Sequence, residues 1–139
     1  MGEVSVKAQL ENVFDRDMFE SGYIDEKNVR SCVIQALVDT GAVMLVLPND
    51  VVTKLGLKNR RKVIVSYADE RKEERPVAGP VTIKIGHRYM NTDCIVGPPL
   101  SEALIGQVIL EELDLLADCT KRQLIPRPES PDFPLLKLK

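Results

Sequence analysis

The segment Asp39-Thr40-Gly41-Ala42 lies between two apolar runs, and this arrangement constrains the fold more than any other feature of the chain. The runs cover residues 33–38 and 43–48. Apolar runs of this length that contain β-branched residues are typical of buried strands. A carboxylate at the end of a buried strand is costly to desolvate, so it is expected to have a function. We therefore predict a tight turn that places Asp39 at the end of a buried strand.

Composition narrows the class of protein. The chain has 139 residues, 44% hydrophobic and 29% charged, which describes one ordinary globular domain. A net charge of −2, with only three Tyr and three Phe for stacking, disfavours a nucleic-acid-binding β-barrel despite the basic cluster at 60–62. The first ten residues lack the apolar core of a signal peptide, and no segment has the ~20 apolar residues of a membrane helix. We expect neither a nucleic-acid nor a membrane partner.

The nucleophilic and metal-binding residues are few. Cys32, Cys94 and Cys119 are odd in number and widely spaced, which indicates reduced thiols of a cytoplasmic protein. The single histidine, His87, follows Gly86 in a predicted hairpin turn, and no nucleophile motif accompanies it. Closely spaced His or Cys ligands and a Gly-rich phosphate loop are both missing from the sequence. We predict no metal and no organic cofactor.

Hydrophobic patterns predict a chain of short strands. Strands are expected at residues 4–10, 29–38, 43–47, 62–68, 77–85 and 90–96. Residues 11–28 are expected to form a polar excursion or irregular hairpin, and residues 69–74 a charged hairpin tip. Short helices are expected after Pro48 and over residues 107–113, and a strand pair at 115–118 and 123–125. Short strands at close intervals predict a mainly β closed barrel with one or two short helices.

We predict a single domain over residues 1–139. It has an N-terminal strand and hairpin extension at 1–30 and a Pro-rich C-terminal tail at 127–139. Prolines cannot join a central strand, so the tail is expected to be extended.

Two motifs together carry a family resemblance. Asp39-Thr40-Gly41-Ala42 and Ala103-Leu104-Ile105-Gly106 resemble the active-site turn and the hydrophobic-hydrophobic-Gly segment of the retropepsin-like aspartic proteases. The similarity runs from Ser31 to Pro126. Within the family, the chain most resembles a small bacterial subset whose members have an extended amino-terminal hairpin and a Pro-rich tail. It implies a retropepsin-like acid-protease barrel that forms a two-fold dimer. Candidate cleft residues are Val43, Met44, Tyr67, Ile105 and Gly106.

The chemistry implied by this resemblance needs two copies of the chain. Aspartic peptidases use two carboxylates that share one proton, and this sequence has one Asp-Thr-Gly. A two-fold homodimer would place Asp39 beside its symmetry mate, with Thr40, Gly41 and Ala42 as the supporting turn. We therefore expect an aspartic endopeptidase that acts on a peptide or protein substrate. Two other acids, Asp114 and Asp118, are better explained as turn residues.

The chain departs from the family pattern at two places, and an alternative function remains open. Typical retropepsins pair an acid after the turn with an arginine after the glycine, whereas this chain has Val43 and Gln107. The hairpin at the position of the family's flap is charged and lacks glycine between Ser66 and Glu74. The alternative is a non-catalytic peptide-binding or assembly module on the same dimeric fold. The resemblance also implies that the apolar chain ends interleave at the dimer interface; a disordered tail is the competing interpretation.

Overall fold

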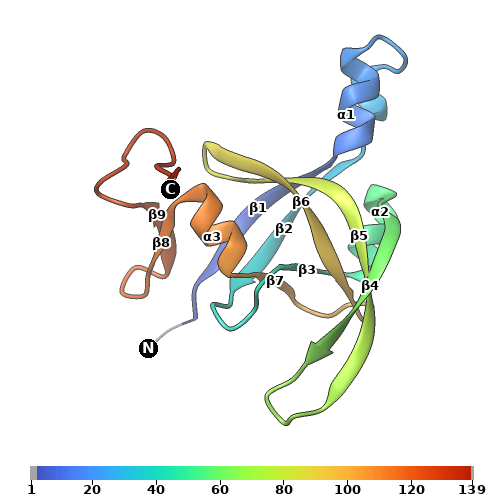
Figure 1. The fold of residues 1–139 in the computed structure, drawn as a ribbon. Coiled ribbons are helices and arrows are strands. Elements are labelled where there is room, and N and C mark those ends of the chain that lie inside the picture. Colours follow the sequence, from blue (N-terminus) through green and yellow to red (C-terminus); the bar gives the residue numbers. More distant parts are fainter. Residues whose placement is uncertain (1–2, 139) are drawn as a thin grey trace.

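The computed structural model describes residues 3–138 and contains a closed β-barrel with a two-stranded hairpin beside it (Figure 1). The predicted domain limits at residues 1 and 139 lie outside the described residues. The strands are β1 (Ser5–Asn12), β2 (Ser31–Val38), β3 (Leu45–Pro48), β4 (Lys58–Ser66), β5 (Lys72–Ile85), β6 (Arg88–Gly97), β7 (Ala103–Ile105), β8 (Leu115–Asp118) and β9 (Gln123–Pro126). The helices are α1 (Val13–Glu20), α2 (Asn49–Leu55), α3 (Gln107–Leu113) and a 3-10 helix, η1 (Glu26–Asn28).

Six strands close the barrel. Hydrogen bonding runs in the order β1-β2-β7-β3-β6-β5, and an antiparallel pairing of β5 with β1 completes the ring. Strand β4 pairs with β5 outside this ring. Strand β7 is parallel to β2 and antiparallel to β3, so it lies between the two strands that flank the Asp39 turn. The predicted mainly β class is confirmed, whereas the expected number of α-helices was too low, because the described residues form three.

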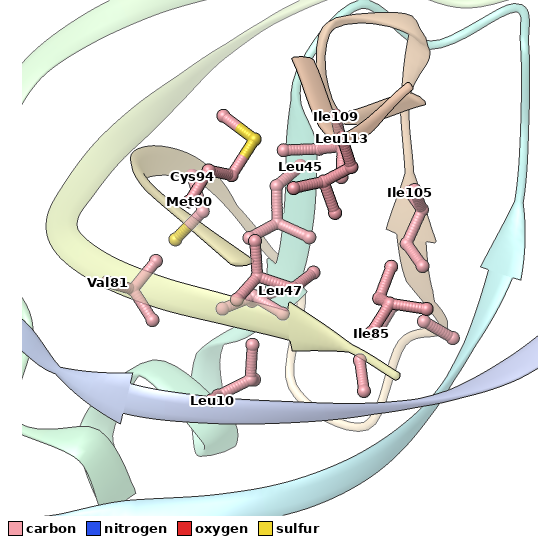
Figure 2. Close-up of a cluster of buried hydrophobic side chains, with 14 of the residues drawn as sticks. Leu10, Leu45, Leu47, Val81, Ile85, Met90, Cys94, Ile105, Ile109 and Leu113 are labelled. Atoms are coloured by element: carbon pink, nitrogen blue, oxygen red, sulfur yellow. The ribbon is translucent and has the colours of Figure 1, made fainter. Parts of the chain in front are cut away.

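Side chains from strands and helices fill the barrel. Leu10 of β1, Leu45 and Leu47 of β3, Ile105 of β7 and Ile109 of α3 are all buried to 1% exposure or less (Figure 2). The strand pattern of β1 is the predicted one, since Ala8 and Leu10 are buried while Ser5, Lys7 and Gln9 are exposed. Burying a side chain of this size contributes about 1.5–3 kcal/mol. The core therefore holds together the two segments that carry the motifs.

The polar segment after β1 forms the predicted excursion, but it is helical and not an irregular hairpin. Helix α1 projects from the barrel (Figure 1), and none of its residues is buried. The Asn12 side chain caps it by accepting a hydrogen bond of 3.0 Å from the Asp15 backbone N–H. Arg16 then joins Glu11 at 2.7 Å and Glu26 at 2.9 Å. Because a cap and ion pairs support this helix, hydrophobic periodicity could not reveal it.

The two strands of the long hairpin, β4 and β5, begin at other residues than those predicted. Strand β4 begins at Lys58 instead of residue 62, and β5 begins at Lys72, so Glu73 and Glu74 belong to a strand. Ile64 pairs with Glu74, and Val65 pairs with Glu73. This part of the hairpin lies outside the closed ring, where polar side chains in a strand remain in water.

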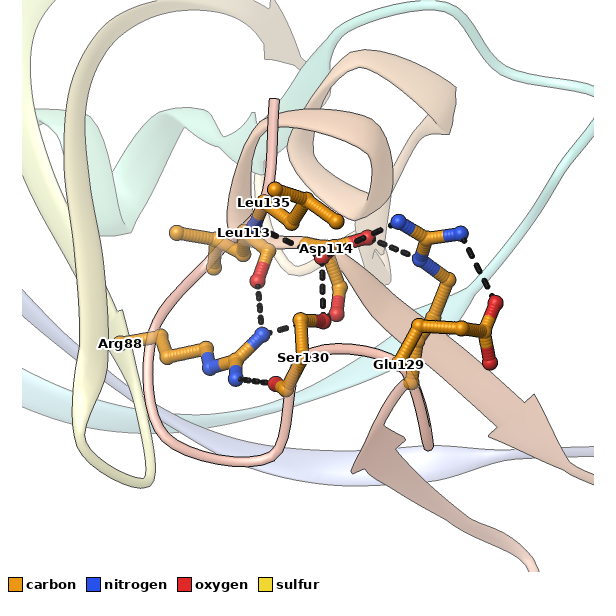
Figure 3. Close-up of polar contacts among 7 residues, drawn as sticks. Arg88, Leu113, Asp114, Glu129, Ser130 and Leu135 are labelled. Atoms are coloured by element: carbon orange, nitrogen blue, oxygen red, sulfur yellow. Dashed lines mark hydrogen bonds and ion pairs between the residues drawn. The ribbon is translucent and has the colours of Figure 1, made fainter. Parts of the chain in front are cut away.

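The C-terminal segment is attached to the end of α3. Asp114 is the left-handed C-cap of α3, with φ of 58°, as expected of a turn residue. Its buried carboxylate accepts hydrogen bonds from the Arg127 guanidinium, the Ser130 hydroxyl and the Leu135 backbone N–H (Figure 3). Arg88 donates to the carbonyls of residues 113, 114 and 130 (Figure 3). These bonds hold the tail against its own barrel. The tail forms a loop with a turn in which the Ser130 N–H donates to the Arg127 carbonyl at 2.9 Å, so the prediction of an extended tail was wrong (Figure 1).

Candidate active site

The end of β2 positions Asp39. Val38 pairs with Ile105 of β7, and the Asp39 backbone N–H continues that pairing by donating to the Ile105 carbonyl at 3.0 Å. The Gly41 N–H donates to Asp39 Oδ1 at 2.9 Å, and the Ala42 N–H donates to the Asp39 carbonyl at 3.1 Å. The turn therefore orients a half-buried carboxylate through backbone groups of its own residues.

The second motif supports this turn from behind. The Gln107 N–H donates to the Ala42 carbonyl at 2.8 Å, and the Val108 N–H donates to the Val43 carbonyl at 3.0 Å. A β-carbon on Gly106 would lie 2.5 Å from the Met44 carbonyl oxygen and 2.7 Å from that of Ala42. Only glycine allows the loop and the start of α3 to approach this closely. The structure thus brings the two motifs of the sequence into direct contact.

A cleft of about 950 Å³ opens at Asp39. Its walls come from the loop after the turn and from strands β3, β4, β6 and β7. They include Gly41, Ala42, Val43, Met44, Val46, Val63, Val65, Tyr67, Ile95 and Leu104. Ile105 and Gly106 were also expected at the cleft, but both are buried behind it. Thr40 is exposed beside Asp39 and is not part of the walls. A second depression, of about 650 Å³, adjoins α1 and contains none of the predicted site residues.

The tip of the β4–β5 hairpin is a compact turn over residues 67–71. Tyr67 N–H donates to the Arg71 carbonyl at 2.9 Å, and Glu70 has a left-handed φ of 66°. The Arg71 guanidinium lies 4.4 Å from the centre of the Tyr67 ring. The Tyr67 hydroxyl donates to Glu73 at 3.3 Å. Tyr67 is therefore held between the hairpin tip and the cleft.

Two further charged residues line the cleft, and sequence reasoning did not single them out. Arg75 comes from β5 and Glu102 from the segment before β7. Neither belongs to a motif, and the cleft wall forms only when β4, β5, β6 and β7 come together. For Glu102, one signal was available: it stands two residues before Leu104, so strand alternation places both on one face.

The two positions that depart from the family pattern form no side-chain pair. Val43 is 66% exposed at the cleft, and the Gln107 side chain donates to Glu111 on the next turn of α3 at 3.2 Å. The link between these segments is made by backbone hydrogen bonds instead. No buried charge is left without a partner at this place, which avoids a large destabilisation.

Comparison with known proteins agrees with this geometry. Residues 22–109 match the family described as aspartyl protease. The chain belongs to the aspartyl protease family. The matched part of this aspartyl protease contains the Asp39 turn, the β4–β5 hairpin and Gly106, and membership indicates a protease-type hydrolase. The chain matches no individual curated protein.

Other features of the described residues concern thiols, metals and membranes. Cys32 is half-buried, Cys94 is buried and Cys119 is exposed, and all three are free. Burial raises the pKa of the Cys94 thiol to about 12. Within residues 3–138, no three His, Cys, Asp or Glu side chains form a group that could hold a metal ion. No helix in this part of the chain is long and apolar enough to cross a membrane.

Proposed function

We propose that this aspartyl protease is an endopeptidase in which two Asp39 carboxylates, one from each subunit of a homodimer, activate a water molecule. The observation that carries the proposal is the Asp39 carboxylate itself. It stands at the mouth of an apolar cleft and is oriented by the Gly41 N–H at 2.9 Å. Peptide substrates fit such a cleft because its apolar walls bind side chains while the exposed edges of strands bind backbone.

The reaction requires a second carboxylate. Two carboxylates about 3 Å apart cannot both ionise, so one acts as base toward water while the other donates a proton. An isologous dimer supplies this pair by symmetry. Thr40 is exposed at the turn, which supports a contact with the partner turn. Gly41 and Ala42 keep the turn narrow enough for two copies to meet.

The β4–β5 hairpin supplies a cover for the site. Its residues 63–68 form one wall of the cleft and reach the start of the tip turn at Tyr67 and Ala68. Closure of such a segment over a peptide excludes water and strengthens the electrostatic interactions of the carboxylates. Free thiols at all three cysteines support a cytoplasmic location for this dimer.

The direct test is peptide cleavage. The purified protein and its Asp39→Asn variant are incubated with a peptide library between pH 4 and 7, and products are identified by mass spectrometry. Asp17→Asn is the matched control, because it removes an exposed carboxylate on α1, away from the cleft. We expect cleavage by the wild type and the control, and none by Asp39→Asn.

Dilution tests the dimer. Because each chain contributes one carboxylate, activity should fall faster than linearly when the enzyme is diluted below its dimer dissociation constant. Activity proportional to concentration, together with a monomer in sedimentation, would refute the shared site. Peptide binding without cleavage, by both wild type and Asp39→Asn, would instead support the binding module. That module is the second candidate because Val43 and Gln107 replace the family's ion pair.

A further inference from the structure

The charges in the cleft are few and are not equivalent. Of the residues that line it, only Asp39, Arg75 and Glu102 carry charged side chains. The remaining walls are apolar or neutral. These three groups are therefore what each subunit contributes, among its described residues, to a preference for a charged substrate side chain.

The positive charge in the cleft belongs to Arg75, which already has hydrogen-bond partners within the chain. Arg75 Nε donates to the Val96 carbonyl at 2.8 Å, and its Nη1 donates to Glu73 at 2.9 Å. The Arg75 side chain is only 20% exposed. Glu73 in turn accepts a hydrogen bond from the Tyr67 hydroxyl at 3.3 Å. Because a carboxylate and a carbonyl hold the guanidinium in place, it is a poor ligand for an acidic substrate.

Glu102 is in the opposite situation. It is exposed, and it has no hydrogen-bond or ion-pair partner among residues 3–138. It directly precedes β7, on the face of Leu104, which also lines the cleft. Ile105, whose carbonyl binds the Asp39 N–H, is three residues further along. At about 3.3 Å per residue of extended chain, Glu102 lies about 10 Å along the backbone from Ile105, the residue that binds the Asp39 turn.

We propose that Glu102 is a specificity-determining residue that selects peptides with a lysine or arginine within about three residues of the scissile bond. The apolar wall formed by Val46, Ile95 and Leu104 takes the neighbouring apolar side chains. This inference rests on the proposed function. Glu102 attracts a cation and repels a carboxylate, and in a partly exposed cleft each effect changes the rate by about threefold. Together they give about a tenfold preference, which salt weakens.

The experiment compares matched peptides. One apolar peptide that the enzyme cleaves is made with Lys, Gln or Glu at each of the three positions on either side of the bond. At low ionic strength, kcat/KM for the best Lys peptide should exceed that of its Glu counterpart about tenfold. Glu102→Gln should reduce this ratio to about twofold or less, and Glu102→Lys should invert it. Glu112→Gln, an exposed change on α3 outside the cleft, should keep the wild-type ratio.

Binding separates this inference from the proposed function. The same peptides are titrated calorimetrically into Asp39→Asn and into the Asp39→Asn, Glu102→Gln double variant. If the wild type cuts nothing but the Lys peptide binds better and Glu102→Gln removes the difference, the selectivity stands and the endopeptidase proposal falls. If peptides are cut with no charge preference, or with one that Glu102→Gln leaves intact, the role of Glu102 is refuted. A preference for Glu peptides, or no binding and no cleavage of any peptide, would also refute it.

Discussion

Replacement of Gly106 by alanine should damage the active site from behind. The backbone of Gly106 has φ of −89°, which alanine adopts freely, so any effect must come from space alone. The new methyl carbon would lie 2.5 Å from the Met44 carbonyl oxygen and 2.8 Å from the Val43 carbonyl carbon. Ordinary contacts begin at 3.4 Å, so the loop after Asp39 must retreat by about 0.9 Å.

The magnitude follows from what that movement breaks. Two backbone hydrogen bonds join the start of α3 to this loop: the Gln107 N–H donates to the Ala42 carbonyl at 2.8 Å, and the Val108 N–H donates to the Val43 carbonyl at 3.0 Å. Their loss costs about 1 kcal/mol each, and overpacking adds about 1–3 kcal/mol. We expect a loss of about 3–5 kcal/mol, which lowers Tm by about 9–18 °C in a domain of this size. Displacement of the turn by nearly 1 Å should also lower kcat about 100-fold.

Thermal unfolding followed by circular dichroism measures the first effect, and peptide cleavage the second. Gly86→Ala is the matched control: its methyl group meets no atom within 4 Å, although its φ of 62° carries a modest strain of about 1–2 kcal/mol. A Gly106→Ala protein as stable as Gly86→Ala, or one with wild-type kcat, would refute the argument that close approach at Gly106 supports the Asp39 turn.

Three further predictions concern other parts of the molecule. Hydrogen bonds from Arg127, Ser130 and the Leu135 N–H hold the pKa of Asp114 well below its ordinary value, so its ionised form stabilises the fold above about pH 4, and this contribution is lost as the pH falls through the folded-state pKa. Asp114→Asn should therefore lower Tm at pH 7, and the difference in Tm between wild type and variant should become smaller toward pH 2; a difference that does not change with pH would contradict this. Ser101 Oγ is buried without a hydrogen-bond partner among residues 3–138, so Ser101→Ala should raise stability by about 1 kcal/mol in urea unfolding; a clear loss would show that the hydroxyl is satisfied. Exposed Cys119 should react quickly with a thiol reagent, whereas Cys94 should react only after unfolding; equal rates in the native protein would contradict its burial.

The sequence alone was enough to predict the segments that are defined by local turn residues or by a periodic hydrophobic pattern. The apolar runs around Asp39 predicted strands on both sides of a turn, and the pattern over 107–113 predicted α3 with its observed limits. These predictions held because each segment buries a regular face in one core. Helix α1 was missed because it buries no residue and is supported by Asn12 and by ion pairs, which leave no hydrophobic period.

Only the tertiary structure decided how distant residues act together. Asp114 could be predicted as a turn residue from its position after α3, but its bonds to Arg127 and Ser130 depend on where the tail packs. In the same way, Arg75, which is paired with Glu73, and Glu102, which has no partner among residues 3–138, share a cleft only because β5 and β7 belong to one closed barrel. Local patterns determine which segments form strands, helices and turns. Long-range packing determines which charges face one another, because that depends on barrel closure and not on spacing along the chain.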